Sequence, residues 1–203
     1  NLFVEGGVVP VSAPLAVGDS IEVLGGATLP LNRPTTVGGM VVVRSGATVN
    51  HGANADADLN KGVTNSLDLA VGGDMVVEPG VAFTVRGMGA PKGLVSGSGS
   101  AGSGSGAGHG GTGSDAGSPA MMRPCYDAIK RPRMVGSGYS GKGGGAVKLT
   151  VGGTLFLDSA IDAEGAHINA QYSGSGGSIW ITCRKLVGCG DLDADGGRTH
   201  NNL

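Results

Sequence analysis

Residues Ala146 to Gly165 read AVKLTVGGTLFLDSAIDAEG and contain three short apolar runs separated only by Gly-Gly and Asp-Ser. Residues Leu67 to Val85, LDLAVGGDMVVEPGVAFTV, repeat this pattern, and Leu67 aligns with Val147 without a gap. Self-similar stretches of this length are the sequence signature of a repeat protein. We therefore expect the chain to be built from units of three short strands.

Other stretches fit the same unit. Thr35 to Val49 and Leu15 to Leu29 align with at most one residue of slack, and Gly177 to Gly196 aligns more loosely. The first corner of a unit is usually Gly-Gly and the second is almost as short, which suits glycine because it accepts positive φ. Only the third corner varies in length, over residues 30–34, 50–66, 86–145 and 164–177.

Three strands joined by two tight corners form a coil, and variable loops confined to one corner are typical of stacked coils. The sequence thus predicts an all-β fold, a right-handed parallel β-helix (solenoid) of about five to six coils, each about 4.8 Å above the last. The handedness rests on analogy. A β-sandwich is the main alternative, but it does not predict near-equal corners in successive units. We expect one domain over residues 1–203.

The long third corner at 86–145 is an insertion with two parts. Its first half is a Gly-Ser tract with the composition of a flexible linker. From Met121 onward, apolar residues alternate with basic ones, and we expect this part to dock on the coils with its charges in solvent. The apolar candidates are Met121, Met122, Cys125, Tyr126, Ile129, Met134 and Val135.

Composition restricts the classes of partner. The chain has 203 residues, 42 glycines and a formal net charge of -2, which gives no reason to expect nucleic acid. The sequence contains no run of 18 apolar residues, so it does not predict a membrane-spanning helix. The chain starts within a unit, so we expect it to be a piece of a longer protein. The chain has three cysteines, Cys125, Cys183 and Cys189. Their odd number and spacing are as consistent with one disulfide as with three free thiols.

Alternate residues of the last predicted strand are acidic. Asp193 and Asp195 share one face, and in the preceding unit Asp162 and Glu164 align with them. Stacked carboxylates repel each other unless a cation or water screens them. We identify Asp162, Asp193 and Asp195 as candidate calcium ligands, with a solvated acidic edge as the alternative.

Other motifs do not predict chemistry. Gly136 to Lys142 satisfies GxGxxG, but Gly143 stands where a phosphate loop needs Ser or Thr, and no helix follows. The four histidines (His51, His109, His167 and His200) lie in or near third corners, where solvent-exposed loop histidines are expected. Trp180 should face outward and cover adjacent loop surface. No catalytic residue and no cofactor site is predicted.

The stretch Gly174 to Ile181, GSGGSIWI, followed by Leu186-Val-Gly188 and Leu192 to Gly197, carries a recognisable signature. It resembles the GGxGGSIWI-type repeat of Gly-rich extracellular, adhesin-like proteins. The resemblance implies parallel β-helices at cell surfaces and no catalytic set. It covers roughly Gly143 to Gly197 and supports architecture better than role.

These observations lead to two expectations about function. The first is a non-enzymatic structural module of an extracellular fibre, cell-surface appendage or adhesin-like protein. Its expected partners are neighbouring subunits or flanking domains of the same assembly, with surface glycans as a further candidate. The second is a carbohydrate-active β-helix, a calcium-dependent polysaccharide lyase or a glycan-binding module, with Arg198 or Lys185 as the basic candidate.

Overall fold

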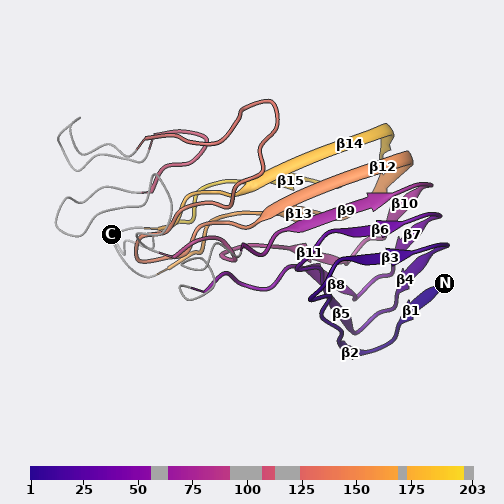
Figure 1. Ribbon diagram of the computed structural model, residues 1–203. Coiled ribbons are helices and arrows are strands. Elements are labelled where there is room, and N and C mark those ends of the chain that lie inside the picture. The colour runs from indigo at the N-terminus through magenta and orange to yellow at the C-terminus, as the bar shows by residue number, and fades with distance from the viewer. Residues whose placement is uncertain (56–63, 92–106, 113–123, 169–172, 199–203) are drawn as a thin grey trace.

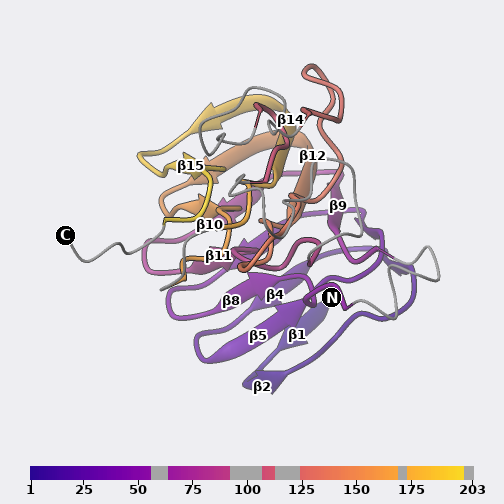
Figure 2. The ribbon, with the colours of Figure 1, turned by 90° about the vertical axis from the view of Figure 1, so that its left-hand side faces the viewer.

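The computed structural model describes residues 1–55, 64–91, 107–112, 124–168 and 173–198. Every strand pair among these residues is parallel, no helix occurs among them, and the strands form two sheets. The fold is therefore all-β with parallel strands, as the repeat pattern predicts. Figures 1 and 2 show the strands stacked in sequence order, from the N-terminal strands at one end to β14 and β15 at the other.

The larger sheet has nine strands in the order β1-β4-β7-β10-β12-β9-β6-β3, and β14 pairs with β12 outside this path. Its strands are β1 (Leu2–Val4), β3 (Leu15–Val17), β4 (Ile21–Val23), β6 (Thr35–Val37), β7 (Val41–Val43), β9 (Leu67–Val71), β10 (Met75–Val77), β12 (Ala146–Leu157) and β14 (Ser178–Val187).

The smaller sheet has six strands in the order β15-β13-β11-β8-β5-β2. They are β2 (Gly7–Val8), β5 (Ala27–Pro30), β8 (Thr48–Asn50), β11 (Ala82–Thr84), β13 (Ile161–Asp162) and β15 (Leu192–Asp193). Each corresponds to the third run of a unit, so sequence-equivalent strands lie next to each other.

The pairing register confirms the sequence alignment of the units. Val147 pairs with Leu67, and Leu157 pairs with Val77. The long strand β12 pairs with β9 through its first half and with β10 through its second half, because its Gly-Gly pair does not interrupt it. A register shift between β12 and β14 after Val151 accounts for the looser fit of the last unit.

The core consists of the inward-facing residues of both sheets. In β4, β7 and β10 the outer two residues are buried and the middle one is partly exposed, which is the alternation of a strand with one buried face. Phe83, Leu155 and Ile161 are at most 1 % exposed. A void of about 10 Å³, at the lower limit for one water molecule, lies among the core side chains.

The glycines of the two tight corners have different physical roles. Gly26, Gly46 and Gly80 of the second corner have φ near +80°, as expected for a turn without a Cβ clash. The first-corner glycines are not in this region, so the prediction of positive φ is wrong there. A Cβ on Gly72 would lie 2.3 Å from the carbonyl oxygen of Gly38. Close stacking of neighbouring corners requires glycine at this position.

The third corners meet in a bundle of extended glycine-rich segments beside the sheets, which we call the glycine bundle: residues 86–91, 136–145, 163–168, 173–177 and 194–198. Successive residues form backbone hydrogen bonds to different segments: the Gly143 N–H donates to the carbonyl of Ala90, and the Gly144 N–H donates to the carbonyl of Ser175. A Cβ on Gly144 would lie 1.8 Å from the carbonyl oxygen of Ala163. Backbones pack directly on one another here, which explains much of the glycine content.

Candidate functional site

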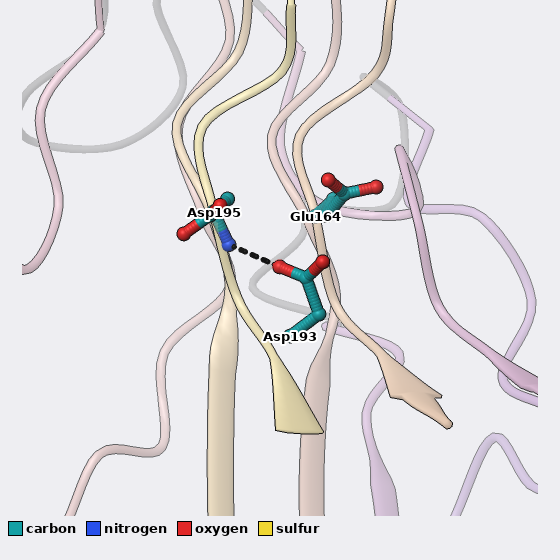
Figure 3. A group of neighbouring side chains, drawn as sticks. All are labelled: Glu164, Asp193 and Asp195. Carbon is teal, nitrogen blue, oxygen red and sulfur yellow. Dashed lines mark hydrogen bonds between the residues drawn. The ribbon is translucent and has the colours of Figure 1, made fainter. Parts of the chain in front are cut away.

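The edge formed by the third corners carries the predicted acidic residues. Asp162 of β13 pairs with Asp193 of β15, as the alignment of the units predicts. One oxygen each of Glu164, Asp193 and Asp195 lies within 4.8 Å of the others, and Figure 3 shows the three side chains on adjacent segments. Asp195 N–H donates to Asp193 Oδ1 at 3.0 Å. Carboxylates in this arrangement are the ligands that calcium prefers.

Asp162, the third candidate ligand from the sequence, is not part of this group. Its Oδ2 atom lies 2.9 Å from Arg86 Nε and accepts a hydrogen bond from the Thr84 hydroxyl at 3.1 Å. Its Oδ1 atom accepts the N–H of Glu164. In the group of carboxylates that lie within 4.8 Å of one another, Glu164 therefore takes the place predicted for Asp162.

Glu164 is buried and already has cationic neighbours. Its side chain is 2 % exposed and forms an ion pair with the Arg86 guanidinium. His167 Nε2 lies 3.3 Å from the same carboxylate oxygen, and His167 Nδ1 accepts the N–H of Arg198 at 2.9 Å. Arg86 therefore balances the charge of the inner carboxylates, whereas Asp193 is partly buried and Asp195 is exposed to solvent.

The predicted basic candidates do not join the acidic group. Arg198 is exposed and contacts His167 through its backbone N–H, and Lys185 is exposed on β14, paired with Thr154 of β12. Lys142, at the end of the rejected phosphate-loop motif, donates its ammonium group to the carbonyl of Asn54. The structure thus uses Lys142 to join two third corners.

Two of the histidines expected to be exposed are buried, so this prediction is wrong for them. His51 is 0 % exposed, its Nδ1 lies 2.8 Å from the carbonyl of Gly52, and its Nε2 accepts the N–H of Ala146. Burial lowers the pKa of His51, so it is neutral in the folded protein. The corner closes over the ring because Gly145 has no side chain. His200 lies outside the described residues.

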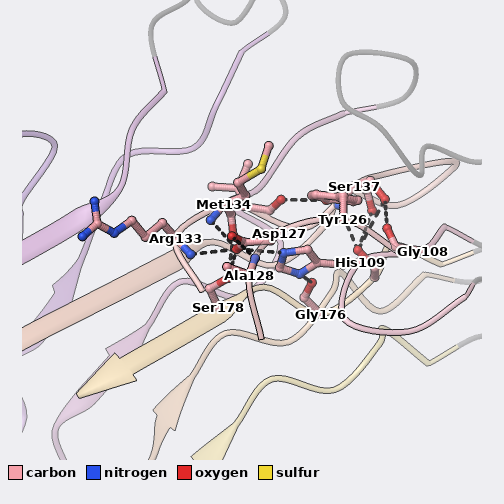
Figure 4. Close-up of polar contacts among 12 residues, drawn as sticks. Gly108, His109, Tyr126, Asp127, Ala128, Arg133, Met134, Ser137, Gly176 and Ser178 are labelled. Atoms are coloured by element: carbon pink, nitrogen blue, oxygen red, sulfur yellow. Dashed lines mark hydrogen bonds and ion pairs between the residues drawn. The ribbon is translucent and has the colours of Figure 1, made fainter. Parts of the chain in front are cut away.

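His109 is the second buried histidine and lies at the centre of a polar network in the insertion (Figure 4). Its side chain is 6 % exposed, and Nδ1 is 2.9 Å from the carbonyl oxygen of Gly176. Nε2 is 3.5 Å from Asp127 Oδ2, and the ring stacks on Tyr126 with centroids 4.6 Å apart. The network joins both described parts of the insertion to the glycine bundle.

Asp127 organises the segment 124–135. Its φ of +74° is the only positive value among the described non-glycine residues, and its carboxylate accepts the N–H groups of Ala128, Arg133 and Met134 at 2.7 Å. Burial would raise the pKa of Asp127, but these hydrogen bonds and the nearby His109 lower it. The carboxylate is therefore ionised where it meets the histidine.

The segment 124–135 docks on the strands, though through fewer apolar residues than expected. Val135 is buried, and Tyr126 donates its hydroxyl to the Val135 carbonyl. Burial raises the pKa of Tyr126 to about 12, so the hydroxyl keeps its proton at neutral pH. Ile129, however, is 97 % exposed, which contradicts its predicted docking. Met121 and Met122 lie outside the described residues.

Trp180 contacts the same insertion. The Arg133 guanidinium carbon lies 4.8 Å from the centre of the Trp180 ring, and Lys148 Nζ lies 5.6 Å from it. Lys148 also forms an ion pair with Asp68 at 3.0 Å. Trp180 therefore anchors loop surface, as its outward position in the strand predicts. The three cysteines are unpaired.

No sequence signal identified His109 and Asp127. They lie in different parts of the insertion, and only the tertiary structure brings them together. The comparisons with protein families, curated proteins and solved structures gave no match. In the part of the chain that the structure describes, no helix is long and apolar enough to cross a membrane.

Proposed function

We propose that the chain is a right-handed parallel β-helix that serves as a non-enzymatic structural module of an extracellular fibre, cell-surface appendage or adhesin-like protein. The observation that carries the proposal is the regular stacking of equivalent strands, for example Ile21 on Val41 and Val41 on Met75. Stacked units form an extended, self-supporting body, which is the usual architecture of spacers and surface stalks. The Gly-rich repeat signature in the sequence supports the same role.

Exposed apolar residues at the outer strands support assembly with neighbours. Phe3 of β1 and Val8 of β2 are 54 % and 67 % exposed, and Leu186 of β14 and Leu192 of β15 are 52 % and 50 % exposed. Among the residues that the structure describes, each of these strands pairs with a neighbouring strand on one side only. Unpaired strand edges with apolar side chains are places where further chain or another subunit adds. We therefore propose neighbouring subunits or flanking domains of the same assembly as the partners.

Sedimentation velocity of the purified chain over a range of concentrations tests this proposal. Association should increase with concentration, and Leu186→Lys with Leu192→Lys should weaken it because the charges would oppose addition at that edge. Ile129→Lys is the matched control, since Ile129 is more exposed but lies on the insertion. A chain that stays monomeric at every concentration, with the charged variants unchanged, would refute the assembly role.

The second candidate function is a calcium-dependent lyase or glycan-binding module, and the group Glu164, Asp193 and Asp195 is the observation that favours it. A lyase acting on acidic polysaccharides creates double bonds that absorb in the ultraviolet. If no new absorbance appears with a panel of such polysaccharides in the presence of calcium, lyase activity is excluded and the structural role is favoured.

Calcium binding itself is tested by thermal unfolding. If the acidic group holds calcium, the melting temperature rises with calcium concentration, because a ligand of the folded state alone stabilises it. Asp193→Asn and Asp195→Asn should abolish the rise. Asp191→Asn should keep it, since Asp191 is exposed next to β15 but outside the group. An unchanged melting temperature in the wild type would identify a solvated acidic edge.

A further inference from the structure

His109 lies between two acceptors. The ring nitrogens face the carbonyl oxygen of Gly176 and the carboxylate of Asp127. A neutral imidazole has one N–H and one lone pair, whereas the imidazolium has two N–H groups. In either neutral tautomer a lone pair would face an acceptor at 2.9 or 3.5 Å. Only the charged form directs an N–H toward both acceptors, and at 3.5 Å the contact of Nε2 with Asp127 is then an ion pair and not a hydrogen bond.

We propose that His109 and Asp127 form a pH-dependent latch, in which the protonated imidazole holds the insertion on the glycine bundle and its deprotonation loosens that contact. This proposal rests on the local geometry and is independent of the assembly role.

The contacts of His109 and Asp127 show which segments the latch joins. His109 belongs to segment 107–112, and its backbone carbonyl accepts the N–H of Tyr126. Asp127 belongs to segment 124–135, and Gly176 to the glycine bundle. The protonated His109 ring thus contacts both Asp127 and Gly176 and joins three separate segments. Loss of that proton leaves the ionised Asp127 carboxylate facing a lone pair, which weakens the contact.

The other titratable groups near His109 do not replace this charge. Tyr126, stacked on the ring, stays neutral because of its raised pKa. Ser178 of β14 places its hydroxyl 3.3 Å from Asp127 Oδ2 and donates to the Met134 carbonyl at 2.7 Å. Cys125 shares one hollow of about 410 Å³ with His109, and Asp195 shares another of about 420 Å³ on the glycine-bundle side. Asp195 is an anion, so it too favours a charged His109.

Trp180 of β14 contacts segment 124–135, so its fluorescence can report whether that segment is docked. Asp127 holds the backbone N–H of Arg133, whose guanidinium covers Trp180, the single tryptophan of the chain. Undocking of the segment should move Arg133 away and expose the indole ring to water. Tryptophan emission then shifts to longer wavelength.

The test is a pH titration of Trp180 emission in the intact chain, from about pH 5 to pH 9, the range where imidazoles lose their proton. We expect one single-proton step toward longer wavelength as pH rises, with far-UV circular dichroism unchanged. His109→Gln should remove the step. His51→Gln and His167→Gln should keep it, because neither residue contacts the network. Emission that stays constant across the range, or a step that persists in His109→Gln, would overturn the proposal.

A measurement on the wild-type protein covers the case in which His109→Gln does not fold. Imidazole NMR resonances report the protonation of each histidine directly. The latch requires that one buried histidine loses its proton over the same pH range as the emission change, and that Arg133→Met leaves this midpoint in place while changing the emission itself. A histidine titration that does not coincide with the emission step would contradict the proposal.

Discussion

At the scale of the residue, glycines set how closely neighbouring corners approach. A Cβ on Gly72 would meet the Gly38 carbonyl oxygen at 2.3 Å, and one on Gly152 would meet the Gly72 carbonyl oxygen at the same distance. These contacts are with backbone, which cannot move without disturbing the strands on either side. Gly18 occupies the equivalent position in the first such corner, and a Cβ there would meet nothing within 4 Å.

Gly72→Ala should destabilise the protein by about 1–3 kcal/mol, because the added methyl group must push neighbouring strands apart. Gly18→Ala is the matched control and should be neutral or slightly stabilising, because alanine lowers the entropy of the unfolded chain. Denaturant unfolding of both variants gives the comparison. Equal loss of stability in the two would mean that close stacking is not why glycine is needed.

At the scale of the element, one arginine links two adjacent strands of the smaller sheet, β11 and β13. Arg86, just after β11, binds Asp162 of β13 and Glu164 just beyond it, and Glu164 in turn lies against Asp193 of β15. The partly exposed Arg86 guanidinium thus places an opposite charge beside the buried Glu164 side chain. Arg44 forms a similar bridge between Glu22 and Glu78, but in that case all three groups are in contact with solvent.

Arg86→Met should destabilise the protein by about 1–3 kcal/mol, less than for a fully buried pair because Arg86 is 43 % exposed. The double variant Arg86→Met with Glu164→Gln should recover part of the loss, since the charge of Glu164 is removed and only Asp162, 17 % exposed, is left without its arginine. Arg44→Met, with exposed partners, should have a smaller effect. Chemical denaturation measures all three, and a double variant no more stable than Arg86→Met alone would contradict this account.

At the scale of the whole molecule, two buried histidines differ in their polar surroundings. His51 is neutral because its Nε2 accepts a backbone N–H in an apolar corner, whereas His109 faces two acceptors. Acid therefore acts on the fold through His51, whereas the latch proposed for His109 and Asp127 would open in base.

Lowering the pH should destabilise the fold through His51. Its pKa in the folded protein lies below the ordinary value of 6.5, so the unfolded chain binds more protons as pH falls below that value. The stabilisation is complete above pH 6.5 and is lost as pH falls toward the lowered pKa, by at most about 1.4 kcal/mol per pH unit for one proton. Unfolding free energies measured at several pH values test this. His51→Gln should flatten the acid slope, and an unchanged slope would assign it to other groups.

The stacked units were predictable because a repeat has a simple sequence signature. The match of Leu67 with Val147 predicted a strand pair that the structure contains, and the same alignment placed Asp162 beside Asp193. The candidate site was predicted only in part. Alignment shows which residues are adjacent between units, but it does not show that Arg86 already pairs with Asp162, because that contact depends on side-chain orientation.

The sequence by itself determined the short strands, the two tight corners and the edge where long loops gather, because these features follow from local periodicity and glycine spacing. Only the tertiary structure decided the roles of the third corners. There, glycine-rich segments that read as linker pack backbone to backbone, and His109 meets Asp127 inside them. Local propensity carries no information about such contacts, since they depend on which distant segments the stacked strands bring together.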